Sequence, residues 1–219
     1  MDFVVAIDGP AGAGKGEIAR RLGEALGLPV LDTGLLYRAV GVGVLAVGGD
    51  LDDADAAARV AGSISPESLD DPALRGAAAG EAASRVAVHA EVRAALFAFQ
   101  RAFADRRGGA VIDGRDIGTV IAPDASVKLF VTASASERAL RRQRQLALQG
   151  EGREMGAVLE EVRQRDARDA GRRAAPMRPA ADAILLDTTD LDIDAAFDAA
   201  HRIVEAARAR WEQSQSHLP

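Results

Sequence analysis

The sequence predicts an α/β fold built on a five-stranded parallel sheet with helices on both faces. Five short apolar runs alternate with longer stretches of helical character, which is typical of repeated strand–helix units. The runs are continuously hydrophobic, so we expect each strand to be buried on both faces. A chain of 219 residues is long enough for one substantial core but short for two.

The expected elements follow one another in a regular order. Strands are expected at residues 3–7, 28–31, 109–113, 127–131 and 183–187. Helices are expected at residues 15–26, 34–47, 52–62, 78–106, 134–149, 155–170 and 192–212. Ligands of open α/β sheets bind at the carboxyl ends of the strands. The residues that follow each strand are therefore the first candidates for a functional site.

Two segments interrupt this alternation. Residues 63–78 hold two prolines among acidic and small residues, which predicts a loop-rich excursion. Residues 150–179 are rich in arginine and begin with glycine breaks, as expected of a mobile lid. We therefore expect a single domain over residues 1–212, with insertions at 63–78 and at about 150–179, the second of them a lid, and a polar, flexible tail at 213–219.

Composition excludes several function classes. The formal net charge of −6 disfavours broad binding to nucleic acid or anionic membranes. No apolar run approaches the roughly 18 residues of a membrane span. The chain has no cysteine, and its N-terminal apolar run lacks a basic leader and a cleavage site. We expect a cytoplasmic protein.

A glycine-rich loop follows the first expected strand. Residues 9–16 read GPAGAGKG, so Gly9 is separated by four residues from Gly14 and Lys15, and a helix follows. Backbone N–H groups in such a loop converge on phosphate oxygens, and the lysine supplies a mobile charge for β and γ phosphates. Lys15 is one of two lysines beside 25 arginines. A chance glycine-rich turn is the weaker interpretation.

Glu17 occupies the position where loops of this spacing usually carry a hydroxyl. A carboxylate beside a triphosphate is repelled. Either the side chain turns away, for example to pair with Arg20 or Arg21, or nucleotide affinity suffers. Glu17 also lies in the first helical turn, where a negative charge suits the helix dipole.

Polar residues also follow the second expected strand. Asp32, Thr33 and Gly34 stand at the start of the next helix, where an ordinary helix cap explains them equally well. The only tyrosine of the chain, Tyr37, is followed by Arg38. This pair makes a second anion site an additional possibility.

A dense charge cluster follows the third expected strand. In DGRDIGT, residues 113–119, Asp113 is placed to order water or magnesium beside phosphates. Arg115 can approach a phosphate, and Asp116 can accept hydrogen bonds from an amino group. A solvated polar turn is the alternative, but the density of charge favours a site.

A third cluster lies within the expected lid. Arg165, Asp169 and Arg172 are spaced i, i+4 and i+7, so on a helix they share one face. The same spacing commonly supports only weak surface salt bridges. Three separate clusters, each suited to phosphates, strengthen the functional interpretation.

The motifs together resemble those of bacterial cytidylate kinases, in the P-loop nucleoside monophosphate kinase group. IDGPAGAGKG, LLYR, ASRVAVHAEVRAAL, DGRDIGTV, RDARDAGR and PAADAILLDTT occur in the family's order from residue 7 to about 189. Adenylate kinases share the first motif but not the DGRD and RDxRDxxR pair. The resemblance implies a P-loop kinase fold, in which residues 34–107 form the monophosphate-binding insertion, and phosphoryl transfer from ATP to CMP or dCMP.

The resemblance also implies the site residues. The CMP or dCMP site would comprise Thr33, Ser84, Arg93, Arg115, Asp116, Arg165, Asp169 and Arg172. The ATP site, with Mg²⁺, would comprise Gly9, Pro10, Ala11, Gly12, Ala13, Gly14, Lys15, Gly16, Glu17 and, from the lid's neighbours, Arg141. Lys15, Asp113, Arg115 and Arg165 would take the catalytic roles. No protein group is expected to be a dedicated metal ligand, and the protein is expected to be a monomer.

Two departures from the family leave alternatives open. Glu17 replaces the usual hydroxyl residue, which favours a nucleotide-binding protein with impaired catalysis as one alternative. The excursion at 63–78 is shorter than in the long bacterial form and lacks its hairpin, so closure over the acceptor can differ. A kinase of another small nucleotide is the nearest alternative. A GTPase is disfavoured because no Asn-Lys-x-Asp motif is present.

Overall fold

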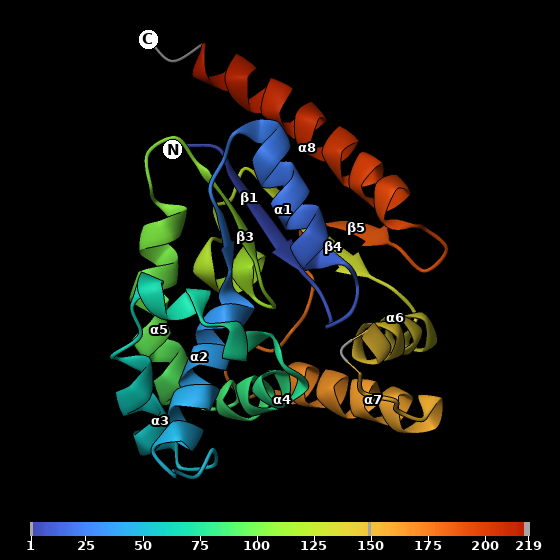
Figure 1. The fold of residues 1–219 in the computed structure, drawn as a ribbon. Coiled ribbons are helices and arrows are strands. Elements are labelled where there is room, and N and C mark those ends of the chain that lie inside the picture. The colour runs from blue at the N-terminus through green and yellow to red at the C-terminus, as the bar shows by residue number, and fades with distance from the viewer. Residues whose placement is uncertain (1, 149, 217–219) are drawn as a thin grey trace.

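The computed structural model describes residues 2–148 and 150–216 and contains one parallel sheet of strand order β2-β3-β1-β4-β5 (Figure 1). Its strands are β1 (Val4–Asp8), β2 (Val30–Asp32), β3 (Ala110–Asp113), β4 (Val127–Thr132) and β5 (Ile184–Asp187). In the register, Asp113 of β3 lies opposite both Ile7 of β1 and Asp32 of β2. The predicted α/β class with five parallel strands is confirmed, and the carboxyl ends of the three strands meet at one edge.

Helices surround this sheet, and most of their bounds lie close to the predicted ranges. They are α1 (Lys15–Leu26), α2 (Thr33–Ala46), α3 (Ala54–Ala61), α4 (Ala77–Val86), α5 (Ala90–Ala104), α6 (Ala135–Leu148), α7 (Met155–Gly171) and α8 (Ile193–Gln215). The helix predicted to end near residue 212 therefore continues into the expected tail. The last residues of that tail, 217–219, lie outside the described residues.

Each face of the sheet has its own core, and helices cover both (Figure 1). On one face, α1 and α8 pack through residues such as Ile18, Leu22 and Val204 against Val5 and Leu129. On the other face, the helices α2 to α5 pack against alternate strand residues of β1, β2 and β3. Adjacent residues of β1 point to opposite cores, because side chains alternate along a strand.

The two edge strands differ from the prediction that all strands are buried on both faces. In β5, Leu185 is 65% exposed and Ile184 is also exposed, and Val30 of β2 is exposed as well. These strands have a neighbour on one side only and incomplete helical cover. A short apolar run does not reveal its position in the sheet order, which tertiary packing decides.

The single helix expected over 78–106 is two helices, because the chain bends between Val86 and Ala90. His89 has an extended backbone at this bend, and its imidazole Nε2 lies 2.8 Å from the carbonyl oxygen of Leu51. The break turns α4 away from α5, and α4 lies beside α2 instead. Residues 63–78 contain two short 3₁₀ helices, at Pro66–Asp70 and Pro72–Arg75.

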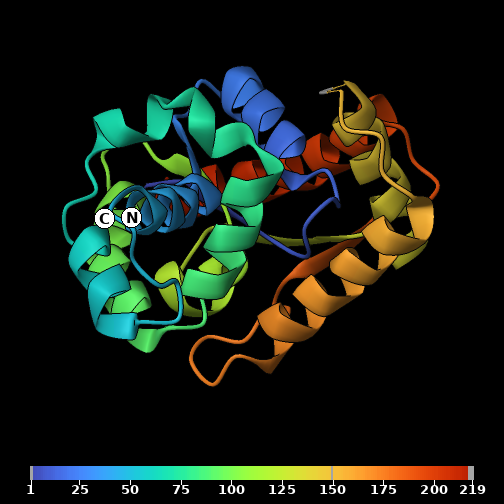
Figure 2. The ribbon, with the colours of Figure 1, turned by 60° about the horizontal axis from the view of Figure 1, so that its bottom comes forward.

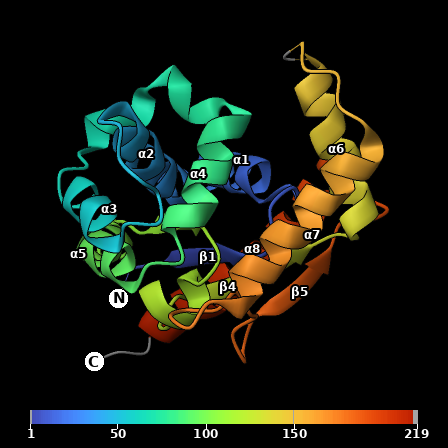
Figure 3. The same cartoon turned by 90° about the horizontal axis from the view of Figure 1, so that it is seen from below.

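Two groups of helices face each other across the carboxyl edge of the sheet (Figures 2 and 3). The inserted helices α2 to α5 form one group, and α6 with α7 forms the other. The ion pair between Glu81 of α4 and Arg168 of α7 bridges them, with Nη1 to Oε1 at 2.6 Å. Over residues 2–148 and 150–216, no helix has the length and apolar character needed to cross a membrane.

Candidate active site

The glycine loop joins β1 to α1 in a conformation that only glycine adopts easily. Gly9 has φ of 139°, and a Cβ built there would lie 1.9 Å from the carbonyl oxygen of Val131. Gly14, with φ of 90°, precedes α1, and no side chain caps this helix. The first amides of α1 are therefore left to bind an anion, as the helix dipole favours.

Lys15 lies buried beneath this loop. Its Nζ donates to the carbonyl oxygen of Pro10 at 3.1 Å and lies 3.7 Å from Oδ1 of Asp113. Burial lowers the pKa of Lys15 below its usual range, and the nearby Arg115 and Arg165 charges act in the same direction. Lys15 thus stands close to the two arginines predicted to share its site.

Asp113 is the carboxylate at the end of β3. Burial raises its pKa above the usual range, although Lys15 opposes the shift. Its Oδ1 is buried and accepts no hydrogen bond among the described residues. A carboxylate oxygen that accepts no hydrogen bond and lies beside a phosphate loop fits a position that orders a hydrated cation.

Glu17 turns away from the phosphate loop. Its Oε2 accepts from Nε of Arg20 at 3.0 Å, and its Oε1 accepts from Nε of Arg21 at 2.8 Å. These hydrogen bonds, first with Arg20 and then with Arg21, lower the pKa of Glu17 to about 2. The side chain stays 39% exposed on the outer face of α1. Of the two alternatives for this glutamate, the structure supports the one in which it pairs with neighbouring arginines.

A network of buried ion pairs lies on the other side of Asp113. Arg93 of α5 pairs with Asp116, and its guanidinium lies 5.6 Å from the ring centroid of Tyr37. Asp169 of α7 pairs with Arg172 and accepts from Nε of Arg115 at 3.2 Å. Five residues predicted from three separate motifs therefore form one cluster.

The remaining predicted acceptor residues border this cluster. The hydroxyl of Thr33 donates to the carbonyl oxygen of Asp113 at 2.8 Å, which joins α2 to β3. Ser84 of α4 is buried, and its hydroxyl makes no hydrogen bond among the described residues. Arg172 stands one residue beyond α7, with extended ψ of 135°, rather than on the predicted helical stripe.

Among the predicted site residues that the structure describes, Arg165 is the arginine whose guanidinium lacks a hydrogen-bonded or ion-paired carboxylate. Its Nε is buried without a partner, and within residues 2–148 and 150–216 no hydrogen bond or ion pair of this side chain occurs. Burial, followed by the charge of Arg115, lowers the pKa of Arg165 to about 10. A Cβ built on Gly80 would lie 3.7 Å from Nη1 of Arg165 and 3.8 Å from Nη2 of Arg38. Both guanidinium groups therefore lie close to the same residue of α4.

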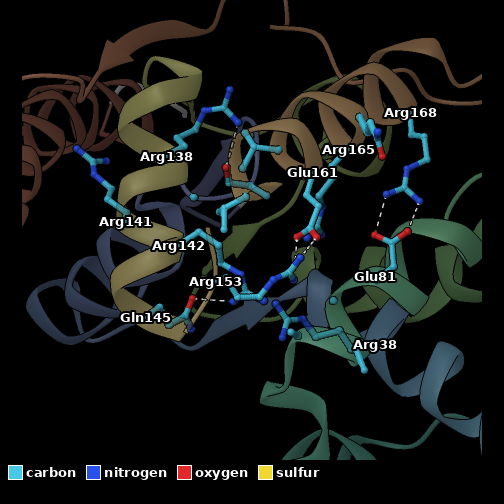
Figure 4. A pocket seen from close by; sticks show the side chains of 18 residues that line it. Arg38, Glu81, Arg138, Arg141, Arg142, Gln145, Arg153, Glu161, Arg165 and Arg168 are labelled. Carbon is cyan, nitrogen blue, oxygen red and sulfur yellow. Dashed lines mark hydrogen bonds and ion pairs between the residues drawn. The ribbon is translucent and has the colours of Figure 1, made fainter. Parts of the chain in front are cut away.

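A cavity of about 570 Å³ opens between the glycine loop and the facing helices (Figure 4). Ala11 and Gly12 line it from the loop, and Arg38, Arg142 and Arg165 line it from three helices. The cavity adjoins the acceptor cluster, because Arg165 borders both. Its size and cationic lining suit a nucleotide with several phosphates.

The side chains of two arginines of α6 point in different directions. Arg141, predicted to help hold ATP, lines the cavity, but its side chain extends away from the other labelled arginines (Figure 4). Its guanidinium donates to the carbonyl oxygens of Thr188 and Leu191, at 2.6 and 3.3 Å. Arg138, which sequence reasoning did not select, donates to the carbonyl oxygen of Ala11 at 3.2 Å. The i, i+4 pair Arg138 and Arg142 is the sequence signal that could have found this side of the cavity.

A glycine loop that leads into an uncapped helix, a buried lysine, and a second cationic cluster beside an arginine-lined cavity define a P-loop nucleoside monophosphate kinase fold and site. Comparisons with known proteins agree. A family model described as cytidylate kinase matches residues 5–207. A cytidylate kinase of Caulobacter sp. (strain K31) is 58% identical over 211 residues, which cover 96% of this chain and 98% of that protein. The chain belongs to the cytidylate kinase family.

Further relatives are consistent with this assignment. A cytidylate kinase of Methylocella silvestris is 56% identical over 205 residues, which cover 94% of this chain and 95% of that protein. A solved structure of an uncharacterized protein from Eubacterium ventriosum ATCC 27560 has a TM-score of 0.55 at 15% identity and covers 93% of this chain and 99% of that one. That likeness concerns the fold alone.

Proposed function

We propose that the protein transfers the γ-phosphoryl group of ATP to CMP or dCMP, giving CDP or dCDP and ADP. Membership of the cytidylate kinase family supports the acceptor. The observation that carries the proposal is the unpartnered guanidinium of Arg165, which lies near Arg38, Arg115 and Lys15. Buried cations without counterions are costly, and phosphate oxygens from two nucleotides would neutralise them.

The donor lies on the glycine-loop side of the site. Backbone N–H groups of residues 11–17 and Nζ of Lys15 hold the β and γ phosphates, and Arg142 faces them from α6. Arg141 supports this side through the 188–191 segment. Asp113, whose Oδ1 accepts no hydrogen bond among the described residues, would hold the hydration shell of a Mg²⁺ ion, and that ion would offset the charge of the phosphates.

The acceptor lies on the ion-pair side. Arg115 and Arg165 clamp the α-phosphate, while Arg93 and Asp116, with Ser84 and Arg172, read the cytosine edge. Cytosine presents an amino group, from which the Asp116 carboxylate accepts, whereas uracil presents an oxygen that the carboxylate repels. Asp169 accepts from the sugar hydroxyl groups, and Thr33 shapes the wall of the pocket. The ion pairs Arg93–Asp116, Arg115–Asp169 and Arg172–Asp169 support this assignment, because they gather these side chains in one cluster.

Catalysis then requires alignment rather than a covalent intermediate. The α-phosphate oxygen of the acceptor is placed in line with the γ-phosphorus, and cations stabilise the charge of the transferring group. Closure of residues 150–179 over the site excludes water and so prevents hydrolysis of ATP. We further propose one domain over residues 1–212, a monomeric state, a cytoplasmic location, and no nucleic-acid partner.

The test is steady-state ADP release with magnesium ATP and a panel of CMP, dCMP, UMP and AMP. The expected result is turnover with CMP and dCMP at a kcat/KM at least about tenfold above that with AMP, since one lost hydrogen bond to a charged group has this effect. Preferred turnover of AMP or UMP would indicate a kinase of another acceptor. Binding of CMP without turnover would indicate a protein with impaired catalysis.

A further inference from the structure

We propose that Asp8 is a positioning residue that holds the acceptor-reading segment, residues 115–118, in place relative to the phosphate loop. This inference rests on the proposed function. Asp8 ends β1 and is directly followed by Gly9, the first residue of the loop. It was not among the residues selected from the sequence.

The carboxylate of Asp8 accepts hydrogen bonds from two backbone N–H groups. Oδ1 accepts from the N–H of Ile117, and Oδ2 accepts from the N–H of Gly118, both at 2.7 Å. These residues directly follow Arg115 and Asp116 and begin a single π-helical turn, Ile117–Ile121. A two-point contact fixes both the distance and the rotation of this turn.

Both ends of the link are anchored. At one end, Asp8 belongs to β1, which pairs with β3 on one side and β4 on the other, and Asp8 lies opposite Phe130 of β4. At the other end, Asp116 pairs with Arg93, and the N–H of Val120 donates to the carbonyl oxygen of Asp116 at 2.9 Å. A shift at Asp8 would therefore be passed to the side chains that bind the acceptor.

The environment of Asp8 argues against a role in stability alone. Asp8 is 3% exposed, and within the described residues it takes part in no ion pair. The nearby ammonium groups are engaged elsewhere, Lys15 with Pro10 and Lys128 with Pro123 and Asp182. Burial raises the pKa of Asp8 to about 6, which marks its charged form as costly.

The test compares wild type, Asp8→Asn and Asp8→Ala in steady-state kinetics, with calorimetric binding of CMP in the absence of ATP. Asparagine keeps one of the two acceptor oxygens and alanine keeps neither. We expect the KM and Kd for CMP to rise about threefold in Asp8→Asn and about tenfold or more in Asp8→Ala, because one charged hydrogen bond is worth about a factor of ten. The KM for ATP should stay within about twofold of wild type.

Two further variants make the test independent of folding. Asp192→Asn is the matched control, because Asp192 also accepts a backbone N–H, from Ala195 at 2.8 Å, but at the start of α8. Gly118→Ala disturbs the same contact from the other side, since its Cβ would lie 3.3 Å from Oδ2 of Asp8, and 3.1 Å from Cδ of the flexible Lys128 side chain. If neither Asp8 variant folds, Gly118→Ala should still raise the KM for CMP while Asp192→Asn does not.

The outcomes separate this inference from the proposed function. Unchanged CMP affinity in the folded Asp8 variants, or in Gly118→Ala when those do not fold, would overturn the inference. Equal increases in the KM of CMP and of ATP would overturn it too, because they indicate a general structural role. Absence of CMP turnover by the wild type would instead overturn the proposed function.

Discussion

Glu17 and Arg21 lie one helical turn apart on α1, and Nε of Arg21 donates to Oε1 of Glu17 at 2.8 Å. The contact directs the carboxylate along the outer face of the helix, away from the glycine loop. Arg21 in turn donates to Asp194 of α8 at 2.6 Å, so Glu17 belongs to a surface network that joins α1 to α8. The departure from the family's usual hydroxyl residue is thereby compatible with a working donor site.

The Glu17→Thr variant should change the KM for ATP by no more than about twofold. The carboxylate is engaged with two arginines, and exposed ion pairs of this kind contribute only about 0–1 kcal/mol. Lys15→Met is the control and should lower kcat by about 10²-fold or more, because it removes the cation that we propose for the transferring group. Steady-state kinetics with varied ATP provide both values. A fall in KM well beyond twofold in Glu17→Thr would mean that the carboxylate opposes ATP binding.

Gly9→Ala should destabilise the protein severely. A Cβ at residue 9 would lie 1.9 Å from the carbonyl oxygen of Val131, at a φ of 139°. Overpacking and backbone strain each cost about 1–3 kcal/mol. Gly27→Ala is the matched control, because its φ is 67° but nothing lies within 4 Å of the added Cβ. Denaturant unfolding should show a clearly larger loss for Gly9→Ala, and equal losses would contradict the close packing of the loop against β4.

Arg165→Gln should weaken acceptor binding without lowering the stability of the nucleotide-free protein. Burial lowers the pKa of Arg165 to about 10, below its ordinary value, so the charged side chain costs folding free energy at neutral pH. We expect the free energy of unfolding to stay equal or rise by on the order of 1 kcal/mol, while the KM for CMP rises about tenfold or more. Arg168→Gln is the control and should show no such gain, because it removes an existing ion pair with Glu81.

Binding of CMP should weaken as the pH falls through about 6, and this dependence should be smaller in Asp8→Asn. The pKa of Asp8 is raised to about 6 by burial, and below it the carboxyl group loses the negative charge that attracts the N–H groups of Ile117 and Gly118. Asp116 and Lys15 are the charged groups that also act on this pKa. Calorimetric titration with CMP, without ATP, measures the Kd of both proteins between about pH 5 and pH 8, a range that brackets this pKa.

The same pKa shift affects stability in the opposite direction: a fall in pH weakens CMP binding but stabilises the folded wild type relative to Asp8→Asn. Because the folded-state pKa lies above the ordinary aspartate value of 3.8, the folded protein takes up a proton before the unfolded chain does. Relative to Asp8→Asn, the wild type should gain free energy of unfolding as the pH falls through about 6 toward 4. Denaturant unfolding at both ends of this window checks the sign. A relative loss instead would show that the folded state favours the charged carboxylate.

Much of the site could be predicted from the sequence because each cluster directly follows a strand or lies on a helix of clear periodicity. Residues 9–16 and 113–116 have fixed places in the chain relative to β1 and β3, and parallel strands bring those places to one edge. Asp8 could not be recognised in this way, since its partners are backbone groups 109 and 110 residues away. Arg38 showed only as a possible anion ligand, and its closeness to Arg165 depends on how α2, α4 and α7 pack.

The sequence by itself determined the class of fold, the order of strands and helices, and the chemical groups that the site would contain, because these depend on local periodicity and residue type. Only the tertiary structure decided that the helix over 78–106 breaks at His89, that β2 and β5 are exposed edges, and that Glu17 faces outward. Those outcomes depend on contacts between residues distant in the chain. Such contacts depend on tertiary packing and on which charged side chains form ion pairs, and a local sequence pattern predicts neither.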